Sequence, residues 1–240
     1  MWGGSNSPLA QLVRAFGLHP KGRGFESLIF YKIKKEKIMK IIENALPRMV
    51  FNNVKYKINS TDFPWYFTKT AYDDNTLDEN NPSSIPMTSW ANVIFAPDDN
   101  DDIIKSSPWF YMFESIILTM LDKANEPIEK IFRIRLGMIT GQDSNYINPP
   151  HVDYPFPHKT GLLYFNTTDG DTIFYNEKYD INSDMDSMTY YNQVLKKNMS
   201  VNERISCEEN KLIIFDGLTF HSSTTPTNVA RRMVLNVNFL

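Results

Sequence analysis

The chain has 240 residues, of which 42% are hydrophobic and 13% aromatic, and this is enough for one sizeable domain with a buried core. Its formal net charge is -3 at pH 7, so the composition favours neither nucleic acid nor an anionic membrane surface as a partner. A single cysteine, Cys207, excludes an internal disulfide framework, and the longest apolar run, at 109–121, is too short to span a bilayer. We therefore expect a cytoplasmic protein with no membrane segment.

Residues 1–38 differ in character from the rest of the chain. They hold five of the ten glycines and show little hydrophobic periodicity. The segments PLAQLVRA and GFESL resemble conceptual translations of the D-arm and the T-arm of a transfer-RNA gene. We interpret 1–38 as a non-native or disordered extension, read in frame from an upstream gene, with the real start at Met39. A native flexible extension is the alternative, and 39–240 is expected to be a single domain.

The remaining elements are expected in the following order. From 39 to about 107, short apolar segments alternate with Pro- and Asn-rich breaks that indicate solvated loops. Aromatic and aliphatic residues at helical spacing predict an amphipathic helix over 108–125. Beyond it the hydrophobic period is that of strands, which we expect at 132–140, 159–166, 171–175, 204–209, 211–216, 218–223 and 231–239. Asp169-Gly170-Asp171 is interpreted as a hairpin turn between two of these strands.

Short strands separated by turn signals are typical of an antiparallel sandwich or barrel. Together with the helix they predict a mainly β fold with buttressing α-helices. Its core is expected to be a double-stranded β-helix of the jelly-roll or cupin-like type, at about 132–239.

Three side chains in this region are candidates to share a metal ion. His151 and Asp153 lie two residues apart in an extended segment, so they point to the same side. His221 follows seventy residues later in the strand-like FDGLTFHSS and supplies a third ligand. Two imidazoles and one carboxylate leave metal positions open, as in non-haem Fe(II) oxygenases. Zinc is the rival metal, although the HExxH motif of many zinc hydrolases is absent from the sequence.

An arginine ten residues after His221 suits a second part of such a site. Arg231 opens the expected last strand, and its planar guanidinium can bind a carboxylate through two parallel hydrogen bonds. Met233, Leu235 and Val237 alternate with Arg231, which predicts that Arg231 faces the interior and that its neighbour Arg232 faces the opposite way. Arg232 is the alternative if this assignment is displaced by one residue.

The ordered motifs RIRLGMITG, PPHVD, TGLLYFN, GDTIFY, KLIIFDGLTFH and RRMVLNVNF resemble those of the iron(II)/2-oxoglutarate-dependent dioxygenases, in particular the prolyl 4-hydroxylase-like branch. The resemblance covers about 132–239. It implies that His151, Asp153 and His221 are catalytic ligands of Fe(II). It further implies that Arg231 and Tyr164 bind the distal carboxylate of 2-oxoglutarate.

The implied reaction couples the decarboxylation of 2-oxoglutarate by dioxygen to the hydroxylation of an unactivated C–H bond, with ascorbate as an optional reductant. Dioxygenase-fold halogenases have Ala or Gly in place of the carboxylate, so Asp153 favours hydroxylation. The partner is then an unknown substrate, a prolyl or other protein side chain or a small molecule. Two alternatives remain open, a non-catalytic jelly-roll binding module and a zinc hydrolase with the same pocket. His158 is interpreted as a loop residue.

Overall fold

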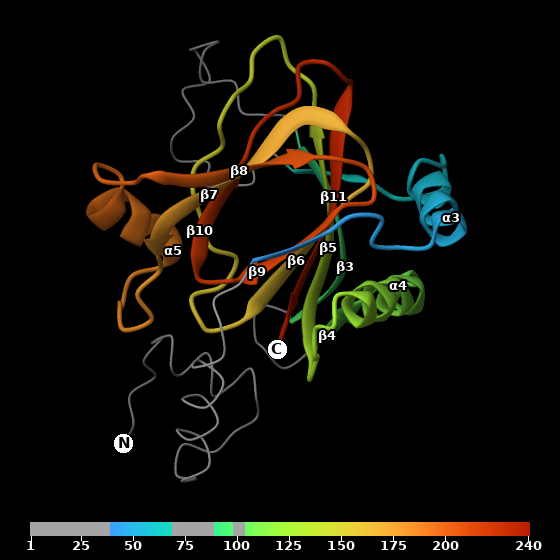
Figure 1. Cartoon of the computed structure of the whole chain (residues 1–240), viewed down its shortest axis with the longest axis horizontal. Helices are drawn as coiled ribbons and strands as arrows, with labels where there is room; N and C mark the ends of the chain where they lie inside the picture. The colour runs from blue at the N-terminus through green and yellow to red at the C-terminus, as the bar shows by residue number, and fades with distance from the viewer. Residues whose placement is uncertain (1–38, 69–88, 98–103) are drawn as a thin grey trace, which may run out of the picture.

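The structure is a computed structural model that describes residues 39–68, 89–97 and 104–240 (Figure 1). The extension inferred for 1–38 lies outside the described residues. Along the chain the elements are β1 (Lys40–Ile42), α3 (Arg48–Ile58), β2 (Tyr66–Thr68), β3 (Ser89–Pro97), β4 (Ile104–Ser106), α4 (Phe110–Lys123), β5 (Ile131–Thr140), β6 (Lys159–Tyr164), β7 (Thr168–Lys178), α5 (Ser187–Tyr190), the π-helical turn η3 (Tyr191–Leu195), β8 (Val201–Cys207), β9 (Leu212–Asp216), β10 (Thr219–Ser223) and β11 (Arg231–Phe239).

The described strands form two antiparallel sheets. The larger sheet has the order β1-β9-β6-β11-β5-β3-β2, with β4 paired to β3, and the smaller sheet has the order β10-β7-β8. Two isolated bridges, Ile147 with Thr224 and His151 with His221, join the connection between β5 and β6 to strand β10. This connection therefore runs along the edge of the smaller sheet. The two sheets and this connection together enclose a barrel-like interior.

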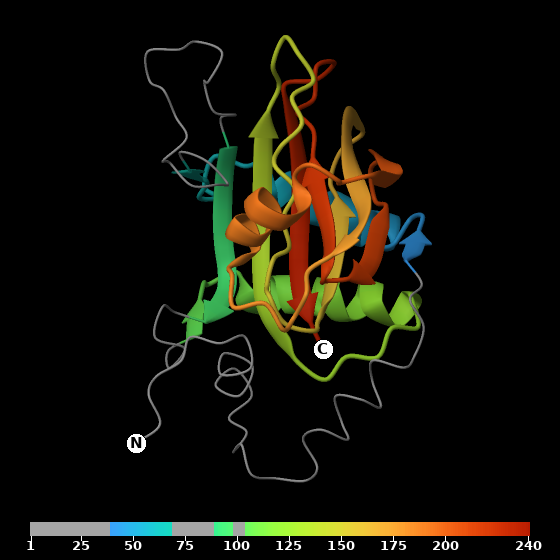
Figure 2. The ribbon, with the colours of Figure 1, turned by 90° about the vertical axis from the view of Figure 1, so that its left-hand side faces the viewer.

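The two long helices cover the outer face of the larger sheet. Figure 1 shows α3 and α4 on the side away from the smaller sheet, and Figure 2 shows α4 running across the strands. Burial of apolar side chains, which contributes about 1.5–3 kcal/mol for each large one, holds the helices in place. The buried side chains of α4 are Phe113, Ile116, Ile117, Met120 and Leu121. Met233, Leu235, Val237 and Phe239 of β11 belong to the same apolar cluster.

The inner face of the larger sheet packs against the smaller sheet. Apolar side chains of both sheets form this second cluster, namely Leu162, Tyr164, Phe174, Ile205, Cys207, Ile213, Phe215 and Val234. Because Val234 lies in this cluster and side chains alternate along a strand, Arg232, Asn236 and Asn238 of β11 also face inward. The interior of the barrel is thus apolar in one part and lined by polar groups of β11 in another.

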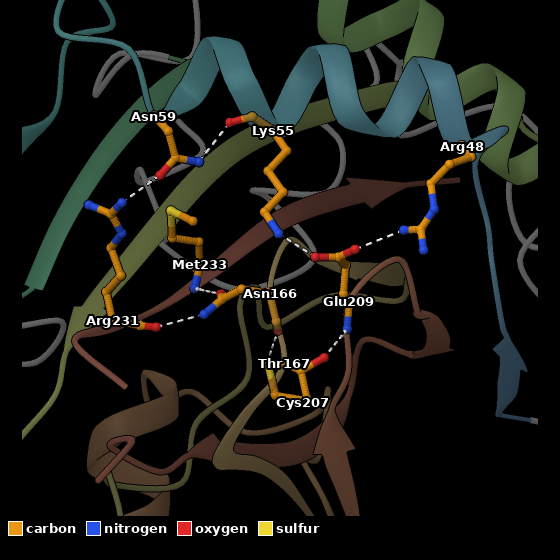
Figure 3. Close-up of polar contacts among 9 residues, drawn as sticks. All are labelled: Arg48, Lys55, Asn59, Asn166, Thr167, Cys207, Glu209, Arg231 and Met233. Carbon is orange, nitrogen blue, oxygen red and sulfur yellow. Dashed lines mark hydrogen bonds and ion pairs between the residues drawn. The ribbon is translucent and has the colours of Figure 1, made fainter. Parts of the chain in front are cut away.

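The turn between β8 and β9 fastens the N-terminal part of the domain. Asn210 has a positive φ of 61°, a conformation that asparagine tolerates better than most residues. Its side-chain Oδ1 accepts a hydrogen bond from the backbone N–H of Leu46 at 2.9 Å, and its Nδ2 donates to the carbonyl of Leu46 at 2.9 Å. Glu209 beside it forms ion pairs with Arg48 and Lys55 of α3 (Figure 3).

Most of the expected elements are present, with two differences. The helix expected over 108–125 is α4, and each of the seven expected strands has a counterpart. The helix α3 was not expected, although its buried residues Phe51, Val54 and Ile58 have helical spacing. The interpretation of Asp169-Gly170-Asp171 as a turn was wrong, because all three residues lie within β7. No helix in the described ranges is long and apolar enough to span a membrane.

Candidate metal centre and buried arginine cluster

The structure brings the three predicted ligands together. His151 and His221 exchange two backbone hydrogen bonds of 3.0 Å across the bridge between the β5–β6 connection and β10. Asp153 follows two residues after His151. One potential ligand atom from each of the three side chains lies within 4.8 Å of the others. The extended backbone at 151–153 and the pairing with β10 therefore create the cluster, although the two histidines are far apart in sequence.

The two histidine rings are held in orientations that suit ligation. Nδ1 of His221 lies 3.1 Å from the carbonyl of Thr219, and Nδ1 of His151 lies 3.4 Å from the carbonyl of Pro149. When Nδ1 carries the proton and donates to these carbonyls, Nε2 of each ring has the lone pair that a metal requires. The ring of Phe215 packs at 4.9 Å from the ring of His221 and restricts its rotation.

Burial keeps both imidazoles neutral. It lowers the pKa of His151 to about 3, with a further lowering from the neighbouring His221. It also lowers the pKa of His221, and Asp153 only partly opposes this effect. Because protonated imidazole cannot bind a metal, the neutral form at pH 7 is the one needed for ligation.

Asp153 is held by three side chains that the sequence analysis did not single out. Arg133 donates from Nη1 to Oδ1 at 3.1 Å, and the amides of Asn236 and Asn238 donate to Oδ2 at 3.0 and 2.9 Å. Burial by itself raises the pKa of Asp153, but the guanidinium of Arg133 and these hydrogen bonds hold it well below its usual range. The carboxylate is thus ionised and fixed in orientation.

This donor set fits a divalent metal. Two neutral imidazoles and one ionised carboxylate on one side of a shared point are typical ligands of Fe(II) in oxygenases and leave positions for other ligands. Oδ2 of Asp153 already accepts two hydrogen bonds, whereas Oδ1 accepts one. Oδ1 is therefore the oxygen with a lone pair available to a metal.

Elsewhere in the barrel interior, a buried arginine belongs to a cluster of polar side chains. Arg232 is 5% exposed, and its Nε donates to the carbonyl of Gly170 at 2.9 Å while Nη2 donates to the hydroxyl of Thr172 at 2.8 Å. A Cβ at Gly170 would lie 3.0 Å from Cδ of Arg232 and 2.9 Å from the carbonyl oxygen of Thr224. A glycine at this position of β7 therefore permits the close approach of Arg232. This packing, and not a turn, explains why position 170 is a glycine.

Tyr164 belongs to the same cluster. It is fully buried, its hydroxyl is 2.6 Å from that of Thr172, and the guanidinium of Arg232 lies 5.3 Å from the centre of its ring. Burial raises the pKa of Tyr164, so the phenol keeps its proton and remains a hydrogen-bond donor. Tyr164, Thr172 and Arg232 together present two hydroxyls and a cation, a combination suited to a carboxylate.

The expected position of Arg231 was wrong. Arg231 is exposed, and its Nη2 donates to Oδ1 of Asn59 at 2.6 Å, at the end of α3 (Figure 3). The apolar residues of β11 do alternate with Arg231 on one face of the strand, but that face is not the one that lines the barrel interior. Met233 and Leu235 share the face of Arg231, and that face packs against the helices, not against the smaller sheet. Arg232 is therefore the arginine that faces the barrel interior.

His158 lies in the connection just before β6, as predicted, but its side chain faces inward. It is buried, its Nδ1 lies 2.7 Å from the carbonyl of Phe156, and its Nε2 has no hydrogen-bond partner among the residues that the structure describes. Its ring lies against Gly217, where a Cβ would come within 2.1 Å of Nε2. Burial lowers the pKa of His158, so the ring is neutral at pH 7.

Neither a protein-family model nor a curated protein sequence matches the chain. Solved structures do. An oxidoreductase of the 2OG-Fe(II) oxygenase family from Burkholderia pseudomallei has a TM-score of 0.51 at 9% identity, covering 92% of this chain and 92% of that chain. A prolyl hydroxylase from Trichoplax adhaerens, solved with a peptide of hypoxia inducible factor, has a TM-score of 0.51 at 14% identity and covers 90% and 89%. The epimerase SnoN, solved with Fe3+, alpha ketoglutarate and nogalamycin RO, has a TM-score of 0.55 at 10% identity and covers 90% and 83%.

These structures share the fold of the chain over most of its length. The chain therefore has the fold found in the 2OG-Fe(II) oxygenase family, and the jelly-roll core expected from the sequence is confirmed. Identities of 9% and 14% carry the likeness no further than the fold.

Proposed function

We propose that the chain is an Fe(II)- and 2-oxoglutarate-dependent oxygenase that hydroxylates an unactivated C–H bond. One observation carries the proposal above all others. A His-Asp-His cluster, in which His221 is buried and His151 and Asp153 are partly buried, and a buried arginine with a tyrosine lie inside one barrel whose fold is that of 2OG-Fe(II) oxygenase structures. Fold alone does not define a reaction, whereas these two groups of side chains supply the chemistry for one.

The metal would be held by His151, Asp153 and His221. The two rings supply neutral nitrogens, and Asp153 supplies the single negative charge. When bound, Fe(II) supplies the redox chemistry by which dioxygen converts 2-oxoglutarate to succinate and carbon dioxide, with one oxygen atom passing to the substrate as hydroxyl. The protein keeps the ligands fixed, and the apolar cluster between the sheets excludes water from the interior.

The second carboxylate of 2-oxoglutarate would be bound by Arg232, Tyr164 and Thr172. Asn236, which contacts Asp153, lies four residues after Arg232 on the same face of β11. Four residues of a strand correspond to roughly 13 Å between Cα atoms. The side chain of Arg232 and a five-carbon dicarboxylate together can bridge this separation. A zinc hydrolase would have no use for a buried cation with two hydroxyls at this position.

The substrate and the type of reaction are proposed separately from the metal and the cosubstrate, because the fold does not specify them. A prolyl or other protein side chain remains a prediction, and the prolyl hydroxylase among the similar structures supports it only through the fold. SnoN has the same fold and is an epimerase. The reaction therefore has to be measured and not inferred from architecture.

The test begins with the metal-free full-length chain under anaerobic conditions. Fe(II) and then 2-oxoglutarate are added, and the weak visible charge-transfer absorption of the Fe(II) chelate is recorded. Asp153→Ala removes one ligand and is expected to abolish the band. Asp143→Ala, at an exposed aspartate in the β5–β6 connection, is the matched control and is expected to leave the band unchanged.

Two results would contradict the proposal. The first is the absence of the band in a chain that is folded by circular dichroism. The second is hydrolytic activity with zinc that needs neither dioxygen nor 2-oxoglutarate, because this indicates a hydrolase. Conversion of 2-oxoglutarate to succinate on admission of air, lost in Asp153→Ala, supports the oxygenase.

A further inference from the structure

Arg133 places a guanidinium directly beside the candidate metal centre. It lies on β5 opposite Asn238 of β11, so both side chains face the barrel interior. Its Nη1 donates to Oδ1 of Asp153 at 3.1 Å and to Oδ1 of Asn238 at 3.3 Å. The ring of Tyr154 lies 5.8 Å from the guanidinium. Three groups therefore fix the position of this cation.

The guanidinium of Arg133 has hydrogen-bonding capacity left over. A guanidinium has five N–H groups, and both described hydrogen bonds of Arg133 start from Nη1. Within the described ranges, Nε and Nη2 make no recorded hydrogen bond. The Arg133 side chain is 19% exposed, compared with 5% for Asp153, so a molecule that enters from solvent can reach the arginine before the carboxylate.

The charges of the loaded site favour an additional anion. A divalent metal and the two arginines, Arg133 and Arg232, carry four positive charges, whereas Asp153 and the 2-oxoglutarate dianion carry three negative charges. The two histidines bind a metal in their neutral form and add no charge. A cation held close to a divalent metal is repelled by it, and a bound anion removes this repulsion.

We propose that Arg133 binds a carboxylate of the substrate and thereby positions the substrate at the metal. The substrate class is then a carboxylic acid, either a free organic acid or the acidic side chain of a peptide. This inference rests on the proposed oxygenase function, because it assumes a metal at the His-Asp-His cluster. Its chemistry requires only a charge-assisted hydrogen bond from the unused edge of the guanidinium.

The proposal can be tested without knowledge of the natural substrate. The full-length chain is loaded with Mn(II) and 2-oxoglutarate, and the paramagnetic relaxation of the methyl protons of acetate and of acetamide is measured by NMR. The two probes have nearly the same shape, but only acetate is charged. Acetate is expected to bind near the metal roughly 10- to 100-fold more strongly than acetamide, which corresponds to one hydrogen bond to a charged group.

Variants identify the residue responsible. Arg133→Gln removes the charge and is expected to abolish the preference for acetate, whereas Arg133→Lys retains part of it. Arg231→Gln, an exposed arginine on β11, is the matched control and is expected to behave like the wild type. If Arg133→Gln does not fold, Arg133→Lys decides the question, because acetate that binds Mn(II) directly would be preferred equally in Arg133→Lys and in the wild type.

Three outcomes overturn the proposal while the proposed function stands. These are equal relaxation of acetate and acetamide, an unchanged acetate preference in Arg133→Gln, and a loss of 2-oxoglutarate affinity in Arg133→Gln as large as the loss of acetate. The last would show that Arg133 serves the cosubstrate. Failure of the wild-type chain to bind Mn(II) or 2-oxoglutarate would instead contradict the oxygenase function.

A second pair of probes separates the two sources of the carboxylate. Free glutamate is compared with the capped peptide acetyl-Gly-Glu-Gly-amide, and each has a glutamine counterpart as its neutral control. Stronger relaxation of the peptide indicates an acidic protein side chain as the substrate, and stronger relaxation of free glutamate indicates a small organic acid. Relaxation of the glutamine probes as strong as that of the acids contradicts the proposal.

Discussion

The assignment of Arg232 to the cosubstrate makes a quantitative prediction about two neighbouring arginines. Arg232 is 5% exposed, so a carboxylate bound to it is also removed from water. Hydrogen bonds to charged groups contribute about 1.5–3 kcal/mol each, and loss of one partner from a buried charge pair costs about 2–5 kcal/mol. We therefore expect Arg232→Met to weaken 2-oxoglutarate binding by about 3–4 kcal/mol, or roughly 150- to 1,000-fold.

Arg231→Met is the matched control for this prediction. Arg231 is exposed, and its described side-chain hydrogen bond goes to Asn59. Surface substitutions of this kind change stability by about 0.5 kcal/mol or less, and 2-oxoglutarate affinity should stay at the wild-type value. Arg232→Lys retains the charge but loses the planar fork, so its affinity should lie between those of the wild type and Arg232→Met.

The assay is an anaerobic titration of the Fe(II)-loaded protein with 2-oxoglutarate, followed by the charge-transfer band or by calorimetry with Mn(II). Thermal unfolding is recorded for every variant, because Arg232 also donates to Gly170 and Thr172. The reasoning is refuted if Arg232→Met remains folded and binds 2-oxoglutarate as the wild type does. A larger loss in Arg231→Met than in Arg232→Met would refute it as well.

Three further changes test other parts of the structure. Asn210→Ala removes two buried hydrogen bonds to Leu46 and places alanine at a φ of 61°. Urea unfolding should show that the free energy of unfolding falls by about 3–5 kcal/mol, and by less in Asn210→Gly. Wild-type stability in Asn210→Ala would contradict this. The pKa of His158 is lowered in the folded protein, so below about pH 6.5 the unfolded chain binds a proton that the folded chain does not. As the pH falls further, the free energy of unfolding of the wild type should decrease relative to that of His158→Asn by up to about 1.4 kcal/mol per pH unit. Parallel curves of stability against pH would exclude this. Gly170→Ala places a Cβ against the carbonyl oxygen of Thr224 and Cδ of Arg232, so one of them must shift. It should weaken 2-oxoglutarate binding with little change in Mn(II) binding, whereas equal losses of both would indicate a general structural defect.

Local features of the sequence were sufficient for the class of fold and for the candidate ligands. The helix α4 and the strands follow from hydrophobic periodicity, which depends on neighbouring residues alone. His151 and Asp153 were recognised because residues two apart in an extended segment point the same way. His221 was found through a motif order that resembles a known family. Bringing His151 and His221 together nevertheless required the pairing of the β5–β6 connection with β10.

The sequence by itself could not determine which face of β11 lines the site. From Arg232 to Val237 every residue of this strand except Asn236 is buried, since helices cover one face and the smaller sheet covers the other. Apolar alternation reveals the orientation of a strand only when one face meets water. Arg133, Asn236 and Asn238 were missed for a related reason, because their convergence on Asp153 depends on the register between β5 and β11. Sequence thus determined the elements and the chemistry of the ligands, and only the packing of two sheets and two helices decided which arginine lies inside.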